Sequence, residues 1–143
     1  MRIRGSLEYF ASSVALVRSY NAMSGKMEPQ GDRAGNSIRA KEVFELSYKG
    51  DPNARRAIEE NALYVGSGLA NLISIFSPEI IVLGGGMALA RDEYIDLIRE
   101  NANKNSIEFC RKDVKIERAT LGYHGALKGA AFFALTRLDG KYI

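Results

Sequence analysis

Three consecutive glycines, Gly84, Gly85 and Gly86, are the residues whose type and spacing best suit ligand binding. They follow four apolar residues, Ile80–Leu83, which predict a short strand covered on both faces, because a half-exposed strand would alternate with polar residues. Glycines between a strand and a helix allow positive φ and close approach of a ligand, and free amides there can bind an anion or a nucleotide. A tight turn packed beneath a neighbouring segment would need the same glycines, so both interpretations stand.

Two well-known glycine motifs and a zinc site are excluded by the residues present. The dinucleotide fingerprint needs a third glycine where Leu89 stands, and a P-loop needs Gly-Lys-Ser/Thr, which does not occur. One cysteine, Cys110, and one histidine, His124, cannot build the usual four-ligand zinc site. A single cysteine also cannot form an internal disulfide, which suits a cytoplasmic protein.

The composition predicts one globular domain over residues 1–143, since 46% hydrophobic residues can fill a core. The net charge of +3 is modest and the basic pairs are isolated, so nucleic-acid binding is not expected. No apolar run approaches the roughly 18 to 20 residues that span a membrane, and no signal peptide opens the sequence.

The elements that must position the glycine turn are mostly helices. Apolar residues at helical spacing predict helices over residues 7–22, 38–49, 88–103 and 125–138, a long loop over 23–37, and a second strand over 114–121. The order strand, helix, strand predicts a right-handed βαβ unit. Two parallel strands are not independently stable, so the sequence predicts a helix-rich α/β fold with an incomplete sheet.

A further long helix should connect Asp51 and Pro78. Asp51 is suited to cap it, and Pro52 to occupy its first position. Its apolar stripe widens toward the C-terminal end, which is therefore expected to be the more deeply buried end. Glycines at 66 and 68 each cost roughly 1 kcal/mol in a helix relative to alanine, so another backbone or a ligand should approach closely there.

Several short motifs, taken in order, resemble the C-terminal portion of the ROK family (repressors, open reading frames and sugar kinases), whose kinases are similar to bacterial glucokinases. Each motif is weak alone, but together they cover nearly the whole chain in matching order and spacing. They are residues 5–12 (GSLEYFAS), 40–44 (AKEVF), 50–52 (GDP), 66–72 (GSGLANL), 78–86 (PEIIVLGGG) and 129–131 (GAA).

The resemblance implies part of an actin- and hexokinase-like (ribonuclease H-like) ATPase fold, with ATP and sugar bound between two lobes and Mg²⁺ in the complete enzyme. Gly84, Gly85 and Gly86 match the family's turn against the adenosine. Glu8 matches a glutamate that hydrogen-bonds sugar hydroxyls, a task suited to an ionised carboxylate. The alternative for Glu8 is a first-turn carboxylate that the helix dipole stabilises.

The departures from the family pattern are equally informative. Ser6 and Met1 stand where the family has zinc-binding cysteines, so no zinc is expected. No role carries over to His124. The family's phosphate loops, its catalytic aspartate and the strands beside the second loop have no counterpart here, so no catalytic residue is assigned.

Three functional hypotheses follow. In the first, the chain is the C-terminal piece of an ATP-dependent hexose kinase and is inactive alone. In the second, it is the sugar-sensing piece of a repressor. In the third, it is a non-catalytic oligomerising remnant. The expected partners are sugar, ATP, and either a second copy or a complementary N-terminal half, because the apolar strand at 80–83 leaves an unpaired edge.

Overall fold

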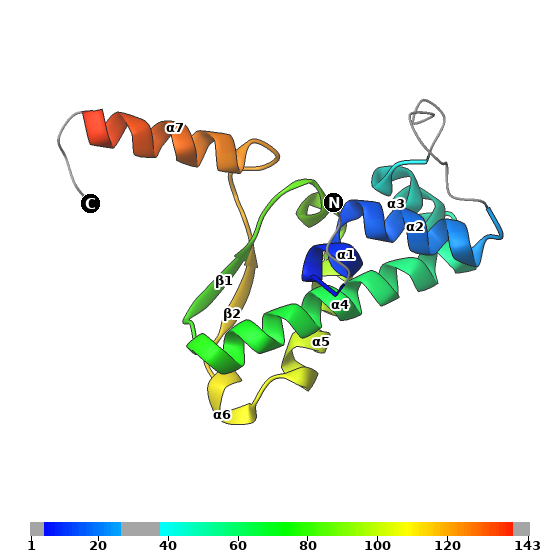
Figure 1. Cartoon of the computed structure of the whole chain (residues 1–143), viewed down its shortest axis with the longest axis horizontal. Coiled ribbons are helices and arrows are strands. Elements are labelled where there is room, and N and C mark those ends of the chain that lie inside the picture. The colour runs from blue at the N-terminus through cyan, green and yellow to red at the C-terminus, as the bar shows by residue number, and fades with distance from the viewer. Residues whose placement is uncertain (1–4, 27–37, 139–143) are drawn as a thin grey trace.

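The computed structural model describes residues 5–26 and 38–138, in which a two-stranded sheet lies at one side of a body of helices (Figure 1). The helices are α1 (Leu7–Ala11), α2 (Ser13–Met23), α3 (Ala40–Tyr48), α4 (Pro52–Phe76), the 3₁₀ helix η2 (Gly86–Leu89), α5 (Asp92–Asn105), α6 (Glu108–Arg111) and α7 (Gly125–Leu138). The strands are β1 (Ile80–Leu83) and β2 (Lys115–Arg118).

Helix α4 is the longest element, and its ends lie where the sequence predicts them. Asp51 Oδ1 accepts hydrogen bonds from the backbone N–H groups of Asn53 (2.8 Å) and Ala54 (3.1 Å). These bonds satisfy two of the amides that a helix start leaves unpaired. At the other end Ser77 takes the left-handed conformation (φ 42°), and Pro78 follows.

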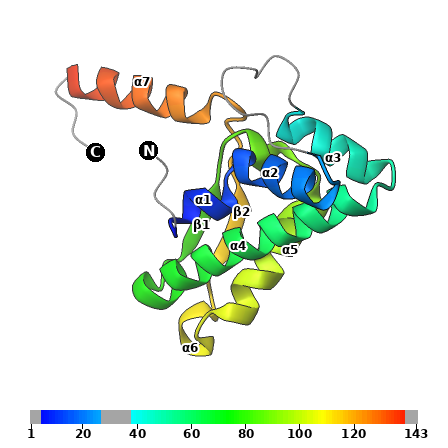
Figure 2. The same ribbon diagram turned by 45° about the vertical axis from the view of Figure 1, so that its right-hand side comes forward.

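Helices α1, α2, α3 and α5 pack against α4, as Figure 2 shows, and their contacts form the core. The largest fully buried side chains are Leu16, Val43, Ile73 and Ile95. A β-carbon on Gly66 would lie 2.5 Å from Asn101 Cβ, and one on Gly68 would lie 2.8 Å from the Leu7 side chain. Close packing thus explains Gly66, which lets α5 approach the α4 backbone, whereas the half-exposed Leu7 side chain beside Gly68 could move aside.

Strands β1 and β2 are parallel and in register from Ile80↔Lys115 to Leu83↔Arg118. Within the described residues they form the whole sheet, which agrees with the predicted shortage of strands. Ile81 and Leu83 pack on the core, but Ile80 is 51% exposed and Val82 57%. The prediction that this strand is covered on both faces is therefore wrong for this chain, because no described element packs on the Ile80–Val82 side.

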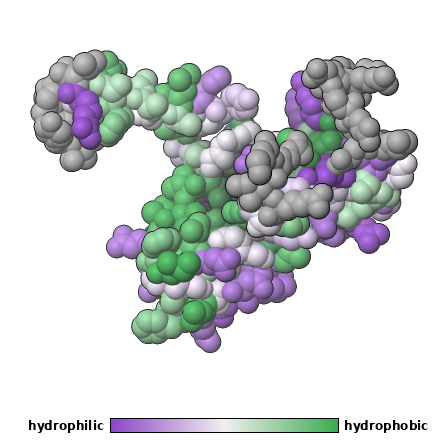
Figure 3. All heavy atoms as spheres, in the orientation of Figure 1, coloured by the Kyte–Doolittle hydropathy of each residue, from purple (hydrophilic) through white to green (hydrophobic). Residues whose placement is uncertain are grey.

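The C-terminal end of α4 is open as well, against the prediction that it is the more deeply buried end. Phe76 is 70% exposed, and Leu72 and Ile75 are exposed with it. Figure 3 shows apolar surface over this side of the molecule, below α7. The apolar stripe of α4 is real and Ile73 is buried, but Leu72, Ile75 and Phe76 stay exposed among the described residues.

Three other sequence predictions need correction. The single helix expected over 7–22 is broken at Ser12, where the backbone is extended. The Ser12 side chain caps α2 by accepting a hydrogen bond from Ala15 N–H. The helix expected over 88–103 begins only at Asp92, after η2, and the strand expected over 114–121 is shorter. Most of the loop expected over 23–37 lies outside the described residues. Helix α7 matches its predicted range and stands away from the other helices (Figures 1 and 2).

Candidate functional site

The glycine turn lies beside a hollow of about 1210 Å³. Helices α2, α3 and α5 and the turn form its walls, which are mainly apolar and aromatic. Its lining includes Val17, Phe44, Tyr48, Leu83, Gly84, Gly86, Met87 and Tyr94. A largely apolar hollow with a few polar groups is the usual form of a small-ligand site.

The glycine turn is open at Gly84 and Gly85, while a β-carbon on Gly86 would lie 3.4 Å from the Tyr123 ring. Gly85 has φ +88°, and no atom lies within 4 Å of where its β-carbon would stand. The nearest atom to a β-carbon on Gly84 is 3.8 Å away, in ordinary contact with Ala119. Gly85 is therefore required by its backbone conformation, and the turn has room for a ligand.

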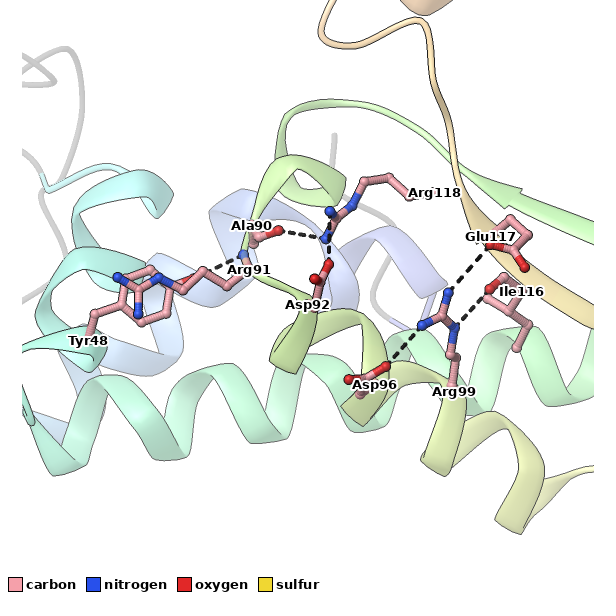
Figure 4. Close-up of polar contacts among 9 residues, drawn as sticks. All are labelled: Tyr48, Ala90, Arg91, Asp92, Asp96, Arg99, Ile116, Glu117 and Arg118. Atoms are coloured by element: carbon pink, nitrogen blue, oxygen red, sulfur yellow. Dashed lines mark hydrogen bonds and ion pairs between the residues drawn. The ribbon is translucent and has the colours of Figure 1, made fainter.

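Tyr48 and Arg91 form a clasp along the wall of the hollow. The Arg91 guanidinium lies 3.9 Å from the centroid of the Tyr48 ring, and Arg91 backbone N–H donates to Tyr48 Oη at 3.2 Å (Figure 4). Tyr48 is the last residue of α3, and Arg91 precedes α5. The clasp thus links α3 to the segment that leaves the glycine turn.

A buried hydrogen-bond chain supports the floor of the hollow. Tyr94 Oη donates to Asn61 Oδ1 at 2.7 Å, and Asn61 Nδ2 donates to the Ser12 carbonyl at 3.4 Å. Burial raises the pKa of Tyr94 well above that of an ordinary tyrosine, so the phenol remains a neutral donor. The chain connects α5, α4 and the junction between α1 and α2.

Two arginines join β2 to α5 (Figure 4). Arg118 Nη2 donates to the Ala90 carbonyl at 2.7 Å, and its Nη1 lies 3.0 Å from Asp92 Oδ1. Arg99 Nε donates to the Ile116 carbonyl at 2.8 Å, and this guanidinium also pairs with Asp96 and Glu117. Sequence reasoning missed both, because contacts between distant residues leave no local pattern.

The predicted site residues are only partly brought together. Gly84 and Gly86 line the hollow, with Gly85 between them. Glu8 lies in the exposed first turn of α1 and does not line the hollow. His124 packs edge-on against Tyr123.

The described residues offer neither a metal cluster nor a membrane span. No group of three or more His, Cys, Asp or Glu residues among them could hold a metal ion, and the absence of zinc from the whole chain stays a prediction. None of the described helices is both long and apolar enough to span a membrane.

Comparison with solved structures defines the fold. The structure resembles a ROK family glucokinase from Streptomyces griseus in complex with glucose and AMPPNP (TM-score 0.78, 31% identity, 92% of this chain and 45% of the other). It also resembles a ROK hexokinase from Thermus thermophilus (TM-score 0.73, 33% identity, 91% of this chain and 41% of the other). The fold is thus part of an actin-like ATPase fold of the hexokinase type.

Sequence comparison gives the family. A profile described as the ROK family matches residues 3–137, and this chain belongs to the ROK family. A glucokinase from Streptomyces coelicolor is 31% identical over 140 residues, which cover 92% of this chain and 44% of that protein. A xylose repressor from Caldicellulosiruptor bescii is 31% identical over 124 residues, which cover 82% and 30%. The chain spans less than half the length of each of these relatives.

Proposed function

We propose that this chain is part of an ATP-dependent hexose kinase of the glucokinase type, to which it contributes the adenosine side of the nucleotide site and one sugar-binding glutamate. The observation that carries the proposal is the open glycine turn beside a largely apolar hollow. The similarity to a glucokinase in complex with glucose and AMPPNP supports it. The cytoplasmic location expected from the single cysteine belongs to the same proposal.

In this proposal the adenosine lies against Gly84, Gly85 and Gly86. A side chain at position 85 would be strained at φ +88°, and relief of that strain would shift the turn against which the adenosine lies. Aromatic and aliphatic residues, among them Phe44 and Met87, give the hollow an apolar surface suited to a flat base. The chain's residues here bind and orient the nucleotide, and do not act on the phosphates.

The sugar role falls to Glu8. Its carboxylate lies in the exposed first turn of α1, beyond the Ser6 cap, and is free of protein ion pairs among the described residues. An ionised carboxylate can accept hydrogen bonds from two sugar hydroxyls. We propose no catalytic residue in this chain.

The remaining parts of the reaction are assigned to a complementary N-terminal half. Phosphoryl transfer needs a carboxylate base at the acceptor hydroxyl and donors around the β- and γ-phosphates, and Mg²⁺ neutralises charge on those phosphates. The exposed apolar face of Ile80 and Val82 is the surface on which that half would pack. The fraction of each relative that the chain spans, 41% to 45% for the two kinase structures, is consistent with this arrangement.

The second candidate is the sugar-sensing part of a repressor, which the xylose repressor relative favours. A ROK family transcriptional regulator with a similar fold, at TM-score 0.64 and 27% identity, also favours it. The two functions differ in their need for nucleotide. A repressor piece should bind sugar without any response to ATP analogues.

Nucleotide binding by the isotope-labelled chain tests the proposal. We expect AMPPNP to shift the amide resonances of residues 83–91 and of α3, with weak affinity because one side of the site is missing. Glucose should shift residues around Glu8, and Glu8→Gln should reduce that response. Sugar shifts without any nucleotide shift would favour the repressor piece, and no response to either ligand would contradict both.

A further inference from the structure

The segment that forms the proposed nucleotide turn is held at both ends by Arg118 and Ala119, two consecutive residues at the C-terminal end of β2. At its entrance, Ala119 N–H donates to the Leu83 carbonyl at 2.8 Å, which continues the ladder between β1 and β2. At its exit, the Arg118 guanidinium holds the Ala90 carbonyl at 2.7 Å and Asp92 at 3.0 Å. We propose that Arg118 is a positioning residue, which keeps the glycine turn in the conformation that accepts a nucleotide.

The geometry of Arg118 suits this role better than a general stabilising one. Its partner Asp92 is 84% exposed, so their ion pair adds little to stability by itself. Arg118 Nε is buried without an acceptor among the described residues, an arrangement that needs an explanation. The two contacts that it does make both lie where the turn ends and α5 begins.

The turn is also held by packing at its far end, where Ala88 is buried and Met87 and Ala90 pack on the core. Gly85, in contrast, lies at positive φ in open space, and η2 ends at Leu89, after which Ala90 N–H donates to the Met87 carbonyl. Tyr48 contacts the next residue, Arg91, from the α3 side. Without Arg118, the exit of the turn would keep this packing and the Tyr48 contact, but it would lose its side-chain hydrogen bond to β2. When the binding-competent conformation of a site is populated for a smaller fraction of the time, the affinity of the site for its ligand falls in proportion.

Arg99 offers a matched control. It also joins β2 to α5, through the Ile116 carbonyl, Asp96 and Glu117, but it touches no residue of the turn. Arg118→Met and Arg99→Met each remove one guanidinium and keep most of the side-chain stem. Arg118→Lys is the milder variant, because one ammonium cannot reproduce the two-sided contact of a planar guanidinium.

The inference rests on the proposed function, and two measurements separate them. In the ligand-free chain, Arg118→Met should accelerate amide hydrogen exchange at residues 85–90, Arg118→Lys should do so less, and Arg99→Met should leave those amides unchanged. In an ADP titration followed by amide resonances, Arg118→Met should raise Kd about tenfold, as expected if the competent turn is populated about a tenth of the time.

Equal exchange at 85–90 in Arg118→Met and Arg99→Met would overturn the inference, and so would an unchanged turn in Arg118→Met. If the unmodified chain binds no ADP, the nucleotide role fails. The exchange comparison would still show whether Arg118 positions the turn.

Discussion

Gly85 is the residue whose replacement has the clearest expected effect. Valine at φ +88° would be strained by on the order of 1–3 kcal/mol, and the turn would shift to relieve that strain. Every 1.4 kcal/mol is a factor of ten in affinity. Gly85→Val should therefore weaken AMPPNP binding about tenfold or more, measured by amide resonance titration of the folded variant.

Gly50 provides the control for this prediction. It has φ +94° with open space around its β-carbon position, but it lies between α3 and α4 and does not line the hollow. Gly50→Val should lose similar stability and keep its nucleotide affinity. Unchanged affinity in Gly85→Val would mean that the glycines serve only the backbone.

Tyr94 shows how a buried polar group supports the hollow. Tyr94→Phe removes the donor to Asn61 Oδ1 and leaves a buried acceptor unpaired. The expected loss is about 1–3 kcal/mol of unfolding free energy, measured by urea denaturation. Tyr64→Phe is the control, because the Tyr64 hydroxyl makes no hydrogen bond to another described residue, and it should change stability little.

The pH dependence of stability tests Tyr94 independently. Its folded pKa is raised by burial, so above the ordinary tyrosine pKa of about 10 the unfolded chain loses a proton that the folded chain keeps. The Tyr94 contribution is therefore complete below that pH and is lost as pH rises through the folded pKa. Tyr94→Phe should show a smaller alkaline loss of stability than the unmodified chain. Identical alkaline profiles would contradict the assignment.

Among whole elements, α4 depends on its N-terminal cap. The hydrogen bond from Ala54 N–H lowers the pKa of Asp51, as do Tyr20, Asn53 and Lys26, while burial opposes them. A lowered folded pKa means that the cap contributes fully above the ordinary aspartate pKa, and that this contribution is lost as pH falls through the folded pKa. Asp51→Asn keeps an acceptor but does not titrate, so its thermal stability should fall less between neutral and acidic pH. An equally steep acid loss would show that other carboxylates dominate.

Elements set by local residues could be predicted from the sequence, whereas features set by contacts between distant residues could not. The ends of α4 were predictable because Asp51, Pro52 and Pro78 start or stop a helix through their effect on the adjacent backbone. The break at Ser12 was missed, since apolar spacing continues across it while the serine caps α2. The exposure of Val82 was missed because burial depends on which other elements pack there. In the site, the glycines gave a local pattern, whereas Arg118 gave none.

At the scale of the whole molecule, the open face of β1 should promote association. Exposed apolar surface beside an unpaired strand edge favours pairing with another chain, so the purified chain should form dimers or larger assemblies in light scattering. Val82→Lys should shift it toward monomer, while Leu127→Lys in α7 should not. Association that falls only with Leu127→Lys would place the interface on α7, and a monomeric unmodified chain would contradict the prediction.

The chain alone should not phosphorylate glucose. The base and the phosphate donors required for transfer were assigned to a complementary half, so a coupled glucokinase assay should stay at background. Turnover well above background would show that this chain carries a complete site.

Because Gly66 has no side chain, it affects how α4 and α5 can move relative to each other. A β-carbon there would overlap Asn101 Cβ and crowd the Ala102 amide and the Ile98 carbonyl, so α4 and α5 touch along their backbones. Helices that mesh this closely cannot slide along each other, since a shift of one residue would push Asn101 into a neighbouring turn. We therefore expect the two helices to move as one unit. A displacement of the glycine turn that moves α5 should therefore move α4 with it.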